Sequence, residues 1–196
     1  MGLQALASSK KNCKRRRGWL VFVDEAGFSQ KPSVRSTWAP RGETPILNHS
    51  FNWKKMSMCA GLAYRWDGLR SRLYFKLKPG SFDSPAIVEF LKDLKKHFRG
   101  FHVTLIWDGL AAHKSLVTKE FLEKQRHWLS IERLPAYAPD LNPVEYVWSN
   151  LKSNELANNC ADDISEASAS TVSGLKRIKK NRALAFSFLE HAGLSI

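Results

Sequence analysis

The sequence contains two apolar runs of strand length, and each run leads directly into an aspartate. Residues 19–23 are all apolar and precede Asp24, and residues 103–107 are nearly all apolar and precede Asp108. Runs of this kind, rich in β-branched and aromatic residues, are typical of central strands that are buried on both faces. The sequence therefore predicts two central strands that each end at a carboxylate.

The other elements follow in an order that predicts a mixed sheet. After the first run we expect a hairpin with strands over 56–64 and 69–77, a helix that ends at Gly100, the second central strand, a helix over 114–125, a strand over 128–134, and helices from Pro143 and over 175–189. Three sequential strands followed by alternating helices and strands indicate an α/β protein. The order matches the ribonuclease H-like fold, a mixed five-stranded sheet with helices on both faces.

Asp24 and Asp108 are candidate metal ligands. Open α/β sheets keep their functional sites outside the strand ends, and two carboxylates on neighbouring strands repel each other unless a cation lies between them. Mg²⁺ prefers such an oxygen-rich, partly hydrated setting. The alternative is that each aspartate forms a strand-end turn or caps a helix, but the repeated run-then-aspartate pattern favours the metal site.

Glu145 has two interpretations that predict different structures. It lies three residues after Asn142, so its carboxylate fits the reciprocal position of a capping box at the start of a helix. Alternatively, it is a third metal ligand, presented by the first turn of that helix beside the two strand ends. One carboxylate cannot fill both roles, and the local residues leave the choice open.

The charge of the chain predicts attraction to nucleic acid. Thirty-one Lys and Arg against eighteen Asp and Glu leave a formal net charge of +13, and such an excess favours polyanionic partners. Six of the cations lie in residues 1–18, which contain no acid: Lys10, Lys11, Lys14, Arg15, Arg16 and Arg17. We expect this segment to be a flexible arm that either is simply solvated or lies along DNA phosphates.

Composition also bears on where the protein is found. The three cysteines form no C-x-x-C pair, the N-terminus lacks the apolar region of a secretory signal, and no run of about 18 apolar residues is present to span a membrane. We therefore expect a cytoplasmic, nucleoid-associated protein without a membrane partner.

Four segments resemble the DDE catalytic domain of the Tc/mariner transposase superfamily, and most of all its bacterial insertion-sequence branch. They are residues 21–28 (VFVDEAGF), 38–42 (WAPRG), 106–108 (IWD) and 134–148 (LPAYAPDLNPVEYVW), in the family's order. The last is the most distinctive, because the family places its catalytic glutamate just after such a Tyr-x-Pro-Asp-Leu-Asn-Pro stretch. The similarity spans roughly residues 19–151.

The resemblance implies a catalytic triad of Asp24, Asp108 and Glu145. Thirty-six residues separate the last two, which is close to the family's typical spacing. In such enzymes the three carboxylates hold two Mg²⁺ ions, with Mn²⁺ as a substitute, for in-line displacement at phosphorus. The implied activity is metal-dependent cleavage of double-stranded DNA at transposon ends and strand transfer into target DNA, carried out by a homodimer.

The chain departs from the family pattern in two places. Gly109 stands where relatives usually carry Asn directly after the second aspartate. In addition, only about eighteen residues precede the first strand, which leaves no room for the helix-turn-helix modules that read transposon ends. We expect that module either to be encoded separately as a helix-turn-helix half or to have been lost.

Several other residues are candidates for support of the site or for DNA contact. His113 matches a histidine that often follows the second aspartate in the family, although it also fits a helix start without function. For Glu25 a supporting or surface role is favoured over metal ligation. Arg41, Lys54 and Lys55 are candidate contacts to the DNA backbone, with a solvated surface as the alternative, and most of the tryptophans are assigned to packing.

The predicted organisation is a basic flexible arm (1–18), a ribonuclease H-like DDE catalytic domain (19–153) and a C-terminal helical extension packed on that domain (154–196). The favoured function is that of a DNA transposase catalytic domain. The alternative is a catalytically silent DNA-binding remnant or regulator. A ribonuclease H-type nuclease for RNA–DNA hybrids is a third hypothesis, which shares the metals but not the signature over 137–148.

Overall fold

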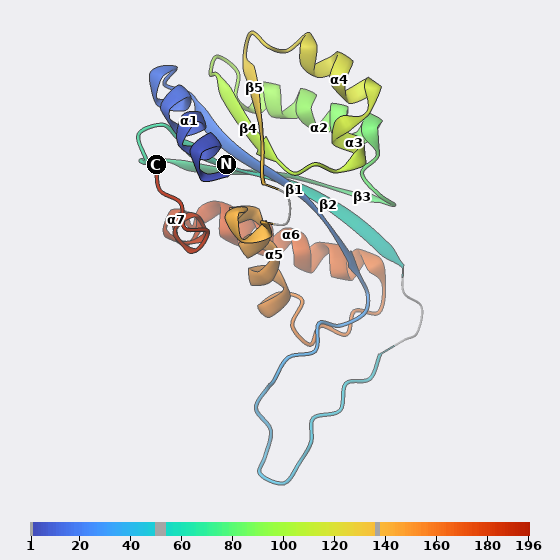
Figure 1. The fold of residues 1–196 in the computed structure, drawn as a ribbon. Coiled ribbons are helices and arrows are strands. Elements are labelled where there is room, and N and C mark those ends of the chain that lie inside the picture. Colours follow the sequence, from blue (N-terminus) through green and yellow to red (C-terminus); the bar gives the residue numbers. More distant parts are fainter. Residues whose placement is uncertain (1, 50–53, 136–137) are drawn as a thin grey trace.

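The computed structural model describes residues 2–49, 54–135 and 138–196, and it arranges them around one five-stranded sheet (Figure 1). In chain order the elements are α1 (Gly2–Arg15), β1 (Trp19–Ser29), β2 (Lys55–Arg65), β3 (Ser71–Pro79), α2 (Ser84–His97), β4 (Val103–Trp107), α3 (Ala111–Lys114), α4 (Leu116–Glu123), β5 (Leu129–Arg133), η1 (Pro139–Leu141), α5 (Pro143–Ser153), α6 (Ile164–Lys180) and α7 (Arg182–His191).

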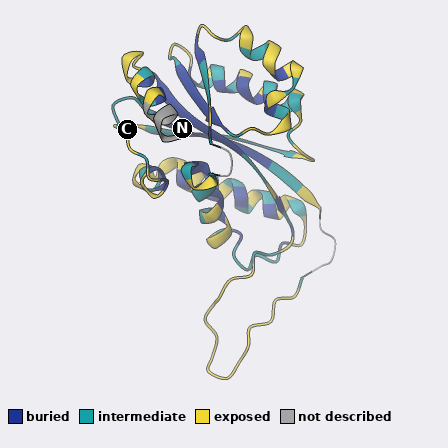
Figure 2. Ribbon diagram, viewed as in Figure 1, coloured by how far each residue is buried: buried dark blue, intermediate teal, exposed yellow. Residues whose placement is uncertain are grey.

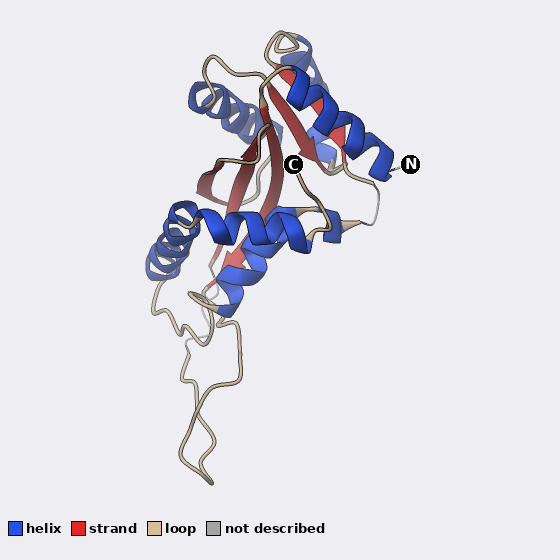
Figure 3. Ribbon diagram, turned by 90° about the vertical axis from the view of Figure 1, so that its left-hand side faces the viewer, coloured by secondary structure: helices blue, strands red, loops and turns tan. Residues whose placement is uncertain are grey.

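The strands lie in the order β3-β2-β1-β4-β5. The pairs β1–β2 and β2–β3 are antiparallel, whereas β1–β4 and β4–β5 are parallel. Helices α2 and α4 cover one face, and α5, α6 and α7 cover the other (Figures 1 and 3). The predicted mixed five-stranded sheet with helices on both faces is therefore confirmed.

The alternation of side chains along β1 explains why this strand is central. Leu20 and Phe22 point into the core shared with α5, α6 and α7. Val21 and Val23 point to the opposite face, into the core shared with α2. All four are buried, in keeping with the buried centre of the sheet (Figure 2), and each such side chain contributes about 1.5–3 kcal/mol on burial. Because side chains two residues apart share a face of the sheet, Asp24 points to the same face as Leu20 and Phe22, which α5 covers.

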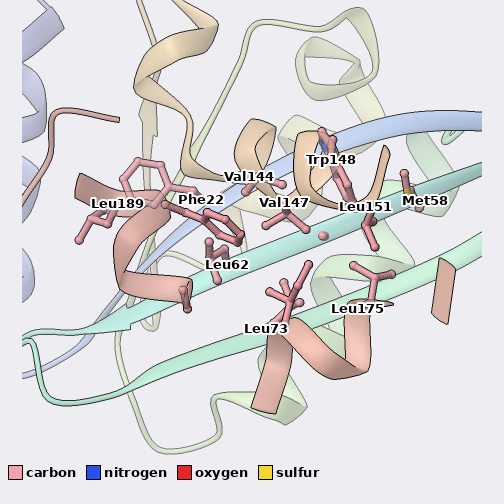
Figure 4. Packing of buried hydrophobic residues seen from close by; sticks show 14 of the residues in the cluster. Phe22, Met58, Leu62, Leu73, Val144, Val147, Trp148, Leu151, Leu175 and Leu189 are labelled. Atoms are coloured by element: carbon pink, nitrogen blue, oxygen red, sulfur yellow. The ribbon is translucent and has the colours of Figure 1, made fainter. Parts of the chain in front are cut away.

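Helix α5 is positioned by its apolar stripe and by its cap. Val144, Val147, Trp148 and Leu151 recur at helical spacing and lie over the sheet (Figure 4). The side chain of Asn142 accepts a hydrogen bond from Val144 N at 3.2 Å, as predicted for an N-cap. Cap and stripe together set where the first turn of α5 stands.

Asp24 does not end its strand, contrary to the prediction. It is the sixth of the eleven residues of β1, which continues to Ser29. The reason is that β2 pairs with β1 along its whole length, whereas β4 pairs only as far as Phe22. The edge at which Asp24 stands is therefore the end of β4, not the end of β1.

The expected flexible arm is a helix in the structure. Residues 2–15 form α1, which contacts β1, β4 and β5. Ser9 and Cys13, four residues apart and so on one helical face, are buried, while Lys11, Lys14 and Arg15 are exposed. The cations belong to the solvent face of a helix whose other face packs on the body of the protein.

Two expected helices are each divided. The one expected over 114–125 is split at Ser115, whose hydroxyl caps α4, and the one expected over 175–189 begins earlier and is split at Asn181, which caps α7. Both breaks occur at residues whose side chains compete for backbone N–H groups. Within the described residues, no helix has the length and apolarity needed to cross a membrane.

Candidate active site

Asp24, Asp108 and Glu145 come from three different elements and line one open cavity of about 710 Å³. Asp24 lies within β1, Asp108 follows directly after β4, and Glu145 is in the first turn of α5. The parallel register that pairs Phe22 with Ile106 brings the two aspartates to the same level of the sheet. The structure thus brings together the three carboxylates that the sequence singled out.

Asp24 is the most buried of the three, with 8% of its surface exposed. Its Oδ2 accepts a hydrogen bond from Trp148 Nε1 at 2.7 Å. Burial raises the pKa of Asp24, the indole bond lowers it in part, and the negative charges of Glu145, Glu25 and Asp108 raise it further, to about 7. This carboxylate therefore lies where a cation is electrostatically favoured.

Asp108 is held by a buried histidine. His113 Nδ1 lies 2.9 Å from Asp108 Oδ1, and His113 Nε2 lies 3.2 Å from Glu25 Oε1. Burial by itself lowers the pKa of His113, but the hydrogen bond and charge of Glu25 and the charge of Asp108 outweigh it and raise the pKa. The imidazole also stacks on Trp107, with centroids 4.1 Å apart. His113 thus supports Asp108 from within the protein.

Glu145 does not form the capping box. The Asn142 N–H, which a reciprocal cap would satisfy, donates instead to Pro139 O at 2.8 Å. The half-buried Glu145 side chain lines the cavity with the two aspartates. Of the two interpretations of this residue, the capping box is wrong.

Lys114 and Arg133 also line the cavity, and sequence analysis missed both. Arg133 ends β5 and is paired in register with Trp107, which precedes Asp108. Lys114 lies near Gly109, where an added Cβ would stand 2.8 Å from the lysine Nζ. For Arg133 the available signal was its position at the carboxyl end of a parallel strand, because such ends meet at one edge of the sheet. Lys114 ends the short helix α3, and no comparable signal marked it.

The other predicted contacts lie elsewhere. Arg41 is in the exposed segment 34–48 after β1, which projects away from the sheet (Figures 1 and 3). Lys54 and Lys55 are exposed at the start of β2. None of the three lines the cavity, because the antiparallel ladder carries this end of β1 and β2 beyond β4. Ala136 and Tyr137 of the signature lie outside the described residues.

The donor set fits a divalent metal ion in its chemistry. Three carboxylates converge on one cavity. Burial, with a smaller contribution from the charges of Glu145 and Asp108, raises the pKa of Asp24, and hard ions such as Mg²⁺ favour oxygen ligands of this kind. Asp24 Oδ2 and Asp108 Oδ1 already accept protein hydrogen bonds. Across the described ranges, no group of three or more His, Cys, Asp or Glu side chains is arranged so that it could hold a metal ion.

Comparison with known proteins gives a family and a fold. The family model described as DDE superfamily endonuclease matches residues 19–167. The Mos1 transposase paired-end complex with the left transposon end aligns with a TM-score of 0.62 at 17% identity, over 97% of this chain and 60% of that one. A pre-cleavage Mos1 transpososome aligns with a TM-score of 0.57 at 14% identity, over 100% and 65%.

The Mos1 transposase catalytic domain with Raltegravir and Mn aligns with a TM-score of 0.52 at 17% identity, over 98% of this chain and 93% of that one. At such identities the likeness establishes the fold, which is the predicted ribonuclease H-like one. The chain spans 60% and 65% of the chains in the first two structures. No curated protein matches it at a significant level.

Proposed function

The chain belongs to the DDE superfamily endonuclease family, and from this premise we propose that it is the catalytic domain of a DNA transposase. The reaction is metal-dependent cleavage of a phosphodiester bond at a transposon end, followed by transfer of the released 3′-hydroxyl to target DNA. The observation that carries the proposal is the convergence of Asp24, Asp108 and Glu145 on one cavity. The Mos1 complexes with transposon DNA support the substrate class.

Asp24, Asp108 and Glu145 would hold two divalent ions, Mg²⁺ or its substitute Mn²⁺. When bound, such ions supply activation of water or a 3′-hydroxyl and stabilisation of the leaving oxygen. His113 keeps the Asp108 carboxylate in place through its Nδ1, which lies 2.9 Å from Oδ1. A protein nucleophile is not required, because water or the DNA 3′-hydroxyl attacks the phosphorus.

Lys114 and Arg133 are the cations that would contact DNA phosphates at the reacting centre. Both line the cavity that contains the carboxylates, and neither forms an ion pair with a described acid within 4.0 Å. Cations in such a position offset the charge of the DNA backbone as it approaches three carboxylates. Arg41, Lys54 and Lys55 are proposed as outer contacts to the DNA backbone.

The proposed partners are double-stranded DNA, a second copy of the chain in the active complex, and a separately encoded helix-turn-helix half that reads the transposon ends. We place the protein in the cytoplasm, at the nucleoid. We also propose the division into residues 1–18, 19–153 and 154–196. The packing of the last segment on the catalytic domain is supported by the core that helices α6 and α7 share with α5.

The test is nicking of supercoiled plasmid with Mn²⁺ by the wild type, Asp108→Asn and Glu190→Gln, purified in parallel. Glu190 is exposed on α7 and does not line the cavity, so its variant controls for the loss of one negative charge. We expect nicking by the wild type and Glu190→Gln but not by Asp108→Asn. Equal nicking by all three would show that the site is misplaced.

The same assay separates the rival functions. A silent DNA-binding remnant would bind plasmid but nick nothing, with or without Mn²⁺. A hybrid nuclease would cut the RNA strand of an RNA–DNA duplex in preference to duplex DNA, so both substrates are included at equal concentration.

A further inference from the structure

Trp148 reaches the same carboxylate site from α5 as Glu145 does. The two residues are three positions apart, which places them on one side of the helix. The indole is buried, with 2% of its surface exposed, and its Nε1–H donates to Asp24 Oδ2 at 2.7 Å. This is at the short end of the range for an N–H···O bond. Helix α5 therefore presents both a carboxylate and a hydrogen-bond donor to Asp24.

We propose that Trp148 is a positioning residue that holds the Asp24 carboxylate in the orientation needed to bind a divalent ion. The inference rests on the proposed function. The bond takes up one lone pair of Oδ2 and fixes the rotation of the carboxylate, and the remaining lone pairs of Oδ1 and Oδ2 can bind an ion. Carboxylates that bind metals are in turn held by hydrogen bonds from neighbouring groups, and loss of such a partner weakens metal binding.

The packing around Trp148 makes it a rigid donor. The residue belongs to the core beneath α5, with Val144, Val147 and Leu151 on the same apolar stripe (Figure 4). A buried indole fixed by its neighbours does not swing away as a surface side chain would. Little water reaches the bond to compete with it, because Asp24 is itself only 8% exposed.

Trp19 supplies a matched control in the same strand as Asp24. It is 1% exposed, and its Nε1 finds no hydrogen-bond partner among the described residues. It lies five residues before Asp24, roughly 17 Å away along β1. Trp19→Phe and Trp148→Phe therefore remove the same atoms from the core, but only the second removes a bond to the site.

The primary measurement is a titration of the metal-free full chain with Mn²⁺. The concentration of unbound Mn²⁺ is measured by electron paramagnetic resonance. We expect Trp148→Phe to bind Mn²⁺ about 10- to 100-fold more weakly than the wild type, and Trp19→Phe to bind as the wild type does. In the nicking assay Trp148→Phe should need more Mn²⁺ for half-maximal rate but approach the wild-type rate at saturation. A packing defect alone would instead lower the nicking rate by the same factor at every Mn²⁺ concentration, including saturation.

If Trp148→Phe does not fold, as judged by thermal unfolding, 3-benzothienylalanine at position 148 replaces the indole N–H by sulfur and keeps the shape of the ring. The same loss of Mn²⁺ affinity is expected. Wild-type affinity in a folded position-148 variant would overturn the role of Trp148 alone. Failure of the wild type itself to bind Mn²⁺ would overturn both this role and the proposed function.

Discussion

His113 Nε2 lies 3.2 Å from Glu25 Oε1, deep beside the candidate active site. The opposite nitrogen of the ring faces Asp108, so one buried imidazole joins two acids that are separated by more than eighty residues of sequence. Glu25 follows Asp24 directly in β1 but points to the other face of the sheet. Two neighbouring acids of β1 thus have different places at the site. Asp24 lines the cavity, whereas Glu25 contacts His113, which in turn contacts Asp108.

Glu25→Gln should lower the pKa of His113. The raised pKa depends on the hydrogen bond and charge of Glu25, which offset the effect of burial. NMR titration of the histidine ring protons measures the change, and the resonance of His102, on the far side of the fold, should not move. An unchanged His113 titration would show that the contact with Glu25 does not control its protonation.

Asp24→Asn should remove part of the pH dependence of stability in the metal-free protein. Because the folded-state pKa of Asp24 is raised from 3.8 to about 7, folding favours its protonated form. The stability that Asp24 contributes is present below pH 3.8 and is lost as the pH rises through 7, on the order of a few kcal/mol. Thermal unfolding of both proteins from pH 4 to 8 tests this.

The gap in stability between Asp24→Asn and the wild type should widen between pH 4 and 7 and then level off. Adding Mg²⁺ or Mn²⁺ at pH 8 should stabilise the wild type and not the variant, because the ion compensates the ionised carboxylates. Metal-dependent nicking should rise over the same range, since Asp24 must lose its proton to bind an ion. A constant gap would mean that Asp24 is ionised throughout.

Lys114→Ala and Arg133→Ala should each weaken DNA binding while leaving Mn²⁺ affinity near that of the wild type. If each cation contacts one phosphate, the negative slope of log affinity against log salt should become smaller in magnitude by about 1 in each variant. Lys119→Ala, an exposed cation on α4 outside the cavity, serves as the control. If all three variants keep the wild-type slope, Lys114 and Arg133 do not contact DNA phosphates.

Gly174→Ala should destabilise the fold although alanine favours helices. A Cβ at this position would lie 2.5 Å from Leu151 Cδ2 and 2.6 Å from Glu155 Oε2, where α6 crosses α5. Such overpacking costs about 1–3 kcal/mol, against a gain in helix propensity of about 1 kcal/mol. Urea unfolding measures the net effect, with Ser173→Ala, at an exposed position of α6, as the control. A more stable Gly174→Ala would show that the side chains of Leu151 and Glu155 move aside to admit the methyl group.

Local signals in the sequence predicted much of the fold and the identity of the three carboxylates. The apolar runs before Asp24 and Asp108 identified the central strands, because strands buried on both faces admit few polar residues. Asn142 and Pro143 marked the start of α5, since capping depends on adjacent residues only. The signature around Glu145 then indicated the family.

Other features depended on partners that are distant in the chain. β1 continues past Asp24 because β2 pairs with it, and β4 stops short; no local pattern encodes the length of a partner strand. The bond from Trp148 to Asp24 spans 124 positions, and local spacing alone assigned this tryptophan to packing. Side chains that meet across a sheet are chosen by register and helix placement. The three carboxylates and their order in the chain were therefore determined by the sequence. Only the tertiary structure decided which groups position them, because those contacts form when the separate elements pack.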